Sequence, residues 1–152
     1  MSKELINIDN IYINVDVDNF EDLIYKLSLK LIETGDVLEE FPNEVIKREK
    51  VFPTGLPTNP FGVAIPHTDA VFTNNNRIVI ATLKKDMPFK VMGSENDSVN
   101  VRVVFLLALS ESNKQLNVLK NVISVISNRE LLEKIIVGNE KEIYDVIHGY
   151  FE

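Results

Sequence analysis

Cysteine is missing from the 152 residues, and histidine occurs only twice, at His67 and His148. Without cysteine the chain has no disulfide framework, no thiolate zinc site, no cysteine nucleophile and no redox thiol pair. The longest apolar run, at residues 103–109, is far shorter than the roughly 20 residues that span a bilayer. The N-terminal segment lacks the apolar core of a signal peptide. We therefore expect a soluble, cytoplasmic protein that does not insert into the membrane.

Basic residues are few relative to acidic ones, with 16 Lys plus Arg against 23 Asp plus Glu and a formal net charge of −7. A protein that binds the phosphate backbone of nucleic acid shows a basic patch, so nucleic acid is not an expected partner. Apolar residues make up 45% of the chain, and the mean hydropathy of +0.01 argues against disorder. A chain of this length can fill its own core, and we expect a single domain over residues 1–152.

Capping residues mark the ends of several expected helices. Asp18 or Asn19 begins the first helix and Gly35 ends it, while Asn128 and Asn139 begin the last two. The expected elements are a strand at 11–15, helices at 20–34 and 42–50, strands at 61–65, 77–83 and 99–109, a polar loop or hairpin at 84–98, and three C-terminal helices, the first over 116–126. This order predicts an α/β single-domain sandwich, in which helices flank a mixed β-sheet on both faces.

His67 follows a short apolar stretch and a proline, in the sequence Gly-Val-Ala-Ile-Pro-His at residues 62–67. Catalytic side chains often lie at such strand ends, where the backbone is fixed. A histidine there can act as a nucleophile, a base or a metal ligand. No cluster with metal-ligand spacing accompanies it, and no serine-nucleophile or glycine-rich phosphate motif is present. The remaining interpretation is a transient phosphoryl acceptor that uses neither metal nor cofactor, with Arg48 as a candidate donor to the phosphoryl oxygens.

Two linked motifs carry a resemblance to a known family. They are Arg-Glu-Lys-Val-Phe-Pro-Thr-Gly at residues 48–55 and the histidine motif at residues 62–67, followed by an apolar strand and a leucine-rich helix. With this combination the chain resembles the fructose/mannitol-type enzyme IIA family of the bacterial phosphoenolpyruvate-dependent sugar phosphotransferase system (PTS). Phe-Pro-Thr-Gly and the Lys-Gln-Leu of residues 114–116 are most similar to the galactitol-specific enzyme IIA. In element order the resemblance covers nearly the whole chain.

The resemblance implies a phosphotransferase component that forms a phosphohistidine intermediate. His67 would accept a phosphoryl group from the phosphohistidine of the carrier protein HPr. It would then pass the group to a cysteine of enzyme IIB, which works with the membrane subunit IIC on galactitol or a related polyol or sugar. Arg48 corresponds to the family's active-site arginine, whose planar fork suits phosphoryl oxygens, and Thr54 lies in the adjoining motif. Because the chain has no cysteine, the acceptor thiol would belong to a separate protein.

Gln115 marks a departure from the mannitol-type members of the family. Those members carry a second histidine near the start of the helix after the core strand, and Gln115 stands at the corresponding position here. Glutamine does not titrate, although it can donate a hydrogen bond to a phosphoryl oxygen or orient His67. The same substitution occurs in the galactitol-type pattern, so it indicates subtype.

Several other residues have simpler interpretations. We expect Asp69 to cap the structure that follows it in preference to orienting His67, and His148 to be structural or on the surface. Exposed apolar residues near His67, among them Phe61, Val71 and Phe72, are candidates for docking the two transfer partners in turn.

Two alternative functions remain open at this stage. In the first, the chain is a regulatory enzyme IIA-like phosphoprotein, whose phosphorylation state controls a transcription factor or a transporter. In the second, it is a binding module in which His67 is chemically inert.

Overall fold

Two long antiparallel strands, β4 (Arg77–Lys90) and β5 (Ser98–Ala108), form the centre of the sheet. The computed structural model describes residues 5–110 and 112–151, and for residues 112–115 the backbone alone. Along β5, Phe105 points into one core and Leu106 into the other, because both faces of the strand pack against helices. The continuous apolar run in the sequence is therefore a strand buried on both sides.

Three further strands flank this pair: β1 (Ile6–Val15), β2 (Gly55–Leu56) and β3 (Gly62–Ala64). Within the described residues the strand order is β1-β4-β5-β3-β2. β1 pairs with β4, and β3 with β5, in parallel, whereas the β4/β5 and β2/β3 pairs are antiparallel. The sheet is mixed, as the sequence predicts, and β2 is an additional short strand in residues 51–66, a segment with four prolines.

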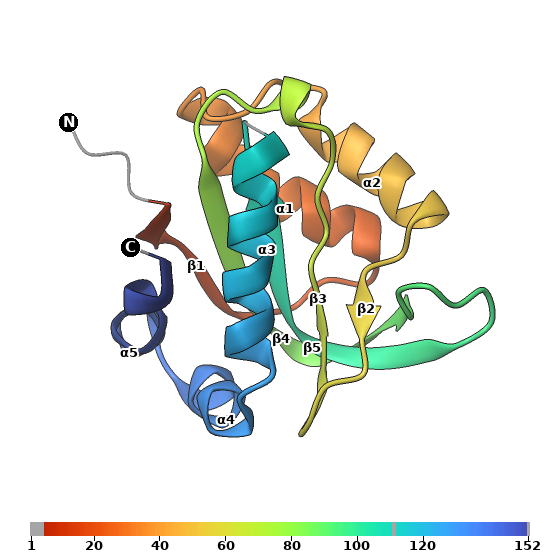
Figure 1. Ribbon diagram of the computed structural model, residues 1–152, viewed down its shortest axis with the longest axis vertical. Helices are drawn as coiled ribbons and strands as arrows, with labels where there is room; N and C mark the ends of the chain where they lie inside the picture. The colour runs from red at the N-terminus through yellow and green to blue at the C-terminus, as the bar shows by residue number, and fades with distance from the viewer. Residues whose placement is uncertain (1–4, 111, 152) are drawn as a thin grey trace.

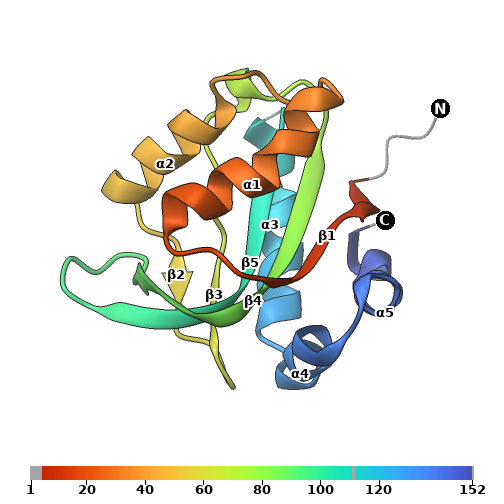
Figure 2. The ribbon, with the colours of Figure 1, turned by 180° about the vertical axis from the view of Figure 1, so that it is seen from behind.

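Helices cover both faces of this sheet. α1 (Phe20–Glu33) and α2 (Phe41–Val51) lie on one face, in front in Figure 2. α3 (Ser112–Ile126), α4 (Arg129–Val137) and α5 (Glu140–Ile147) pack on the other, with α3 in front in Figure 1. The predicted α/β sandwich is confirmed. No helix in the described part of the chain is long and apolar enough to cross a bilayer.

Asparagine side chains begin three of these helices, as their capping signals predict. Asn19 and Asn128 each accept a hydrogen bond from the backbone N–H three residues ahead, at 2.8 and 3.2 Å. Asn139 and Glu142 form a reciprocal capping box, with both hydrogen bonds at 2.9 Å. Gly35 follows α1 with a φ of +74°, a left-handed conformation that favours glycine. Asn19 is therefore the cap where the sequence left two choices.

Of the two forms expected for residues 84–98, a polar loop or a hairpin, the structure shows the hairpin. β4 continues to Lys90 and β5 begins at Ser98, so the connection between them is short. Met87 and Phe89 are only 7% and 5% exposed and pack into the core beneath α1, while Pro88 between them faces solvent. The polar side chains belong to the exposed face of a strand, and the buried face holds too few apolar residues to dominate the pattern.

The helical spacing of Leu116, Leu119, Ile123 and Ile126 predicts an apolar stripe that Val118, Val122 and Val125 widen, and the buried face of α3 differs from it. Leu116 and Ile123 are 72% and 43% exposed, whereas Val118, Val122 and Val125 are buried against the sheet. The helix is rotated so that the valines, expected only to widen the stripe, form its centre.

One edge of the sheet brings distant segments together. Because β3 and β5 run parallel, the chain leaves both strands at the same edge. The backbone N–H of Leu107 donates to the carbonyl oxygen of Pro66 at 3.0 Å, which extends the pairing to the residue before His67. The 3₁₀ turn at Ala70–Phe72 and the start of α3 lie at this edge, at the top of Figure 1.

Candidate functional site

His67 lies at this edge, directly after Pro66, with a partly buried ring. Its Nδ1 is 2.8 Å from the carbonyl oxygen of Ile65. A carbonyl oxygen only accepts hydrogen bonds, so Nδ1 carries a proton, and in the neutral ring Nε2 keeps its lone pair. The backbone therefore fixes both the orientation and the tautomer of the imidazole.

The surroundings of His67 favour the neutral form of its ring. Burial lowers the pKa of His67 below its ordinary value of 6.5, the hydrogen bond to Ile65 partly reverses this, and Arg48 and Asp69 act in opposite directions. A neutral imidazole at neutral pH is nucleophilic, whereas an imidazolium is not.

Arg48 lies in the last turn of α2 and supplies the positive charge of the site. Its Nη1 is 3.7 Å from Oδ1 of Asp69, and its guanidinium lies over the ring of Phe52, 5.1 Å from the centroid. The Nε atom is buried and has no hydrogen-bond partner among the described residues. The planar N–H donors of a guanidinium that is not fully hydrogen-bonded suit an anionic oxygen that arrives with a ligand.

Thr54 is only 3% exposed and connects α2 to the histidine segment. Its backbone N–H and its hydroxyl both donate to the carboxylate of Glu49, each at 2.8 Å. Its hydroxyl oxygen accepts from the backbone N–H of Ile65 at 3.2 Å. Thr54 is therefore linked to His67 indirectly, by hydrogen bonds to the backbone of Ile65.

Glu49 belongs to the site, although the sequence assigned it no role. Burial raises the pKa of Glu49 to about 7 from its ordinary 4.5, against the opposing effect of the two hydrogen bonds from Thr54. Its position directly after Arg48 in the motif at residues 48–55 is the signal that could have drawn attention to it.

Gln115 lies in the first turn of α3, the helix whose start lies at the histidine edge of the sheet in Figure 1. Its backbone is helical, and its side chain lies outside the described residues. Its predicted hydrogen bond to the site stays a prediction.

The expected cap at Asp69 is wrong. Asp69 precedes the 3₁₀ turn without forming a side-chain cap, and its carboxylate pairs with Arg48, because the chain turns back toward the end of α2. His148 lies away from the site, where its ring stacks on that of Tyr144 at 4.8 Å and its Nδ1 is 3.0 Å from the carbonyl oxygen of Tyr144. These contacts are those of a structural residue.

Exposed apolar side chains surround the histidine edge, although not all those expected. Val71, in the 3₁₀ turn, is 73% exposed, and Phe52, beside Arg48, is 59% exposed. Phe61 and Phe72 are partly buried and pack against the two cores, so the docking role expected of them is not supported. We call Phe52 and Val71 the apolar rim.

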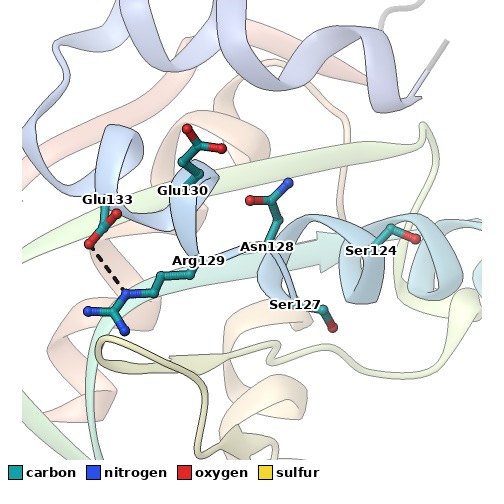
Figure 3. Close-up of a pocket in the computed structure, with 6 residues that line it drawn as sticks. All are labelled: Ser124, Ser127, Asn128, Arg129, Glu130 and Glu133. Atoms are coloured by element: carbon teal, nitrogen blue, oxygen red, sulfur yellow. Dashed lines mark hydrogen bonds and ion pairs between the residues drawn. The ribbon is translucent and has the colours of Figure 1, made fainter.

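The hollow drawn in Figure 3 lies elsewhere, at the corner between α3 and α4, and has a volume of about 500 Å³. Its polar groups serve local structure: Asn128 caps α4, Ser124 donates to a backbone carbonyl of its own helix, and Arg129 pairs with Glu133 at 3.4 Å. None of these side chains is a nucleophile beside a base. Among the described residues, no three His, Asp or Glu side chains gather in a way that could hold a metal ion.

Comparison with known proteins places the chain among phosphotransferase components. The family model "Phosphoenolpyruvate-dependent sugar phosphotransferase system, EIIA 2" matches residues 4–150. The galactitol-specific EIIA component of Escherichia coli K12 is 25% identical over 134 residues, which is 88% of either chain. A stretch of the transcriptional regulator ManR of Bacillus subtilis is 30% identical over 104 residues, covering 68% of this chain and 14% of that protein.

A solved structure shares the fold. It is the complex of enzyme IIAMTL and phosphorylated enzyme IIBMTL from Escherichia coli, matched with a TM-score of 0.77 at 20% identity over 93% of this chain and 95% of that chain.

Proposed function

Because the chain belongs to the EIIA 2 family of the phosphoenolpyruvate-dependent sugar phosphotransferase system, we propose that His67 carries a phosphoryl group from phospho-HPr to enzyme IIB. In the first transfer the lone pair on Nε2 attacks phosphorus, and the bond between phosphorus and the donor imidazole of HPr breaks. In the second a cysteine thiolate of IIB attacks the same phosphorus, and the new N–P bond of His67 breaks. The imidazole leaves as its neutral form, so the carrier is regenerated.

The hydrogen bond between Nδ1 of His67 and the carbonyl of Ile65 is the observation that carries this proposal. It fixes the tautomer in which Nε2 keeps its lone pair, so no proton has to move between the ring nitrogens before the reaction. When Nε2 is phosphorylated the ring gains positive charge, and Nδ1 keeps its proton and continues to donate it to the carbonyl oxygen of Ile65. The geometry therefore favours Nε2 as the phosphorylated nitrogen.

Arg48 is the proposed stabiliser of the phosphoryl group. Its guanidinium is fixed by the ring of Phe52 and loosely held by Asp69, with Nε free of any described partner. Phosphoryl transfer needs positioning and charge stabilisation more than covalent chemistry, and a cation at the rim of a half-buried site supplies both. Thr54 acts indirectly, and Gln115 is proposed to add a hydrogen bond from α3.

The proposed partners are HPr and enzyme IIB, with the membrane subunit IIC reached only through IIB. Both partners must approach the same nitrogen, so they bind in turn, and the apolar rim of Phe52 and Val71 offers both a surface. The similarity to the galactitol-specific component supports galactitol or a related polyol as the sugar. The proposal retains the cytoplasmic location expected from the sequence.

Phosphorylation by the purified upstream proteins tests the function. The chain is mixed with phosphoenolpyruvate, enzyme I and HPr, and the adduct is located by mass spectrometry at neutral to alkaline pH, where an N–P bond survives. We expect one acid-labile phosphoryl group on His67, lost in His67→Ala and retained in the matched control His148→Ala. Full labelling of His67→Ala would refute the site, and phosphoryl loss to a IIB protein but not to its cysteine-free variant would confirm the acceptor.

A regulatory function is the second candidate, favoured by the match to a stretch of ManR. It uses the same phosphorylated His67 but predicts that the group is not passed to IIB. Transfer to IIB in the assay above, followed by sugar phosphorylation with IIC, separates the two candidates.

A further inference from the structure

We propose that Glu49 is a positioning residue for His67, acting through the Thr54 hydroxyl and the backbone of Ile65. This inference rests on the proposed role of His67 in phosphoryl transfer. Glu49 does not touch the imidazole in any recorded contact, so its effect is on the orientation of the ring and not on the reacting atoms.

An unbroken series of hydrogen bonds links the two side chains. The carboxylate of Glu49 accepts the N–H and the hydroxyl of Thr54, at 2.8 Å each. The hydroxyl oxygen of Thr54 accepts the N–H of Ile65 at 3.2 Å, and the carbonyl of Ile65 accepts Nδ1–H of His67 at 2.8 Å. Thr54 thus fixes the N–H of Ile65, and the orientation of His67 depends on the carbonyl group of the same residue.

An ionised carboxylate offers a separate acceptor oxygen to each of the two Thr54 donors in this series. Thr54 presents two hydrogens to Glu49, one from its amide and one from its hydroxyl, and a carboxylate has an acceptor oxygen for each. Protonation of Glu49, or its replacement by glutamine, turns one acceptor into a donor. The Thr54 hydroxyl must then rotate, and its bond to Ile65 changes with it.

Burial disfavours the ionised form of the Glu49 carboxyl group, and the hydrogen bonds that it accepts from Thr54 favour it. Glu49 borders a cavity of about 280 Å³ with Phe20 and Phe89 in its walls. The charged groups around it are Lys50 at the rim, Lys90 on β4, and Arg48 on its own helix, while Glu21 of α1 pairs with Lys50 at 3.9 Å. The cavity gives the carboxyl group a route to exchange protons with solvent.

Gly55 helps to hold Thr54, the residue that links Glu49 to Ile65, in place. A Cβ built on Gly55 would lie 2.6 Å from the carbonyl oxygen of Lys90, so the backbone after Thr54 packs directly on the end of β4. Glu49 on α2 and Gly55 on the sheet therefore hold Thr54 from two sides.

The imidazole tautomer of His67 tests this inference separately from transfer. We would record ¹⁵N spectra of the imidazole in the intact chain, Glu49→Gln, Thr54→Val and Thr54→Ser. Glu44→Gln, which removes another partly buried carboxylate of α2, serves as the control. Wild type, Thr54→Ser and Glu44→Gln should show the Nδ1–H tautomer. Glu49→Gln and Thr54→Val should show a mixture of tautomers and, in single-turnover assays with phospho-HPr, transfer about tenfold slower. Circular dichroism checks that each variant is folded.

The pH profile of transfer adds a second readout. Wild-type transfer should fall as pH drops through 7, where Glu49 gains its proton, and again below 6.5 as His67 does. Glu49→Gln should lose the first step and keep the second. A wild-type tautomer together with a wild-type pH profile in Glu49→Gln would overturn the inference. A wild-type chain that shows the fixed tautomer but accepts no phosphoryl group would overturn the proposed function instead.

Discussion

Removing the ionisable group of Glu49 should abolish a loss of stability that the protein otherwise undergoes as the pH rises toward 7 and above. The folded chain holds the proton of Glu49 more tightly than the unfolded chain does, because burial raises the pKa of this carboxyl group from 4.5 to about 7. Between these values the folded state binds more protons than the unfolded state, so the contribution of Glu49 to stability is greatest below pH 4.5 and is lost as the pH rises through 7. The variant Glu49→Gln has no proton to lose and escapes this loss.

The size of the effect follows from the two pKa values. Each pH unit between 4.5 and about 7 is worth about 1.4 kcal/mol, which gives a difference of about 3 kcal/mol over the whole range. Solvent that enters the adjoining cavity reduces this figure, so about 2 to 3 kcal/mol is expected. Relative to wild type, Glu49→Gln should gain that amount between pH 4.5 and pH 8.

Urea unfolding of both proteins at half-unit steps from pH 4.5 to 8 measures the difference directly. His67 titrates in the same range with the opposite sign: its lowered pKa means that stability is lost as pH falls through 6.5. Repeating the comparison in a His67→Ala background removes this contribution from both proteins. Glu44→Gln, on the same helix and in an ion pair with exposed Lys47, should follow wild type. Parallel curves for wild type and Glu49→Gln would refute the reasoning.

Three further predictions concern the edge of the sheet that carries His67. Arg48→Ala should slow transfer from phospho-HPr about a hundredfold in single-turnover assays while the urea midpoint barely moves, since its ion-pair partner Asp69 is largely exposed. An unchanged rate would remove Arg48 from the mechanism. Val71→Asp should raise the concentration of HPr needed for half-maximal transfer about tenfold without changing the maximal rate, and a change in the maximal rate alone would contradict a docking role. Gly55→Ala should cost about 1 to 3 kcal/mol in urea unfolding, because its Cβ would overlap the Lys90 carbonyl, whereas Gly149→Ala, which meets nothing within 4 Å, should be nearly neutral.

Features set by neighbouring residues could be predicted from the sequence. The asparagine caps at Asn19, Asn128 and Asn139 act within one helical turn, so the pattern that signals them also contains their partners. The buried strand β5 was equally clear, because a strand covered on both faces is apolar throughout.

Features that depend on distant partners were missed. The second half of β4 is polar on one face, and only its pairing with β5 and the cover of α1 show that Met87 and Phe89 are buried. Asp69 has the position of a cap, and its pairing with Arg48 depends on how α2 ends against the histidine segment. The role of Glu49 depends on the turn that brings Thr54 back toward α2. No local sequence pattern predicts that turn.

The hydrogen bond from Leu107 to Pro66 has a consequence for the motion of the site. Proline has no N–H, so Pro66 joins β5 through its carbonyl oxygen, and the histidine segment cannot move away from the sheet without breaking this bond. The Leu107 amide proton exchanges with solvent only when the bond opens, and its exchange rate therefore reports how often the histidine segment leaves its position. A slow rate, close to that of global unfolding, would mean that the carrier presents His67 to both partners on a rigid support and that the partners, not the histidine, make the adjustments.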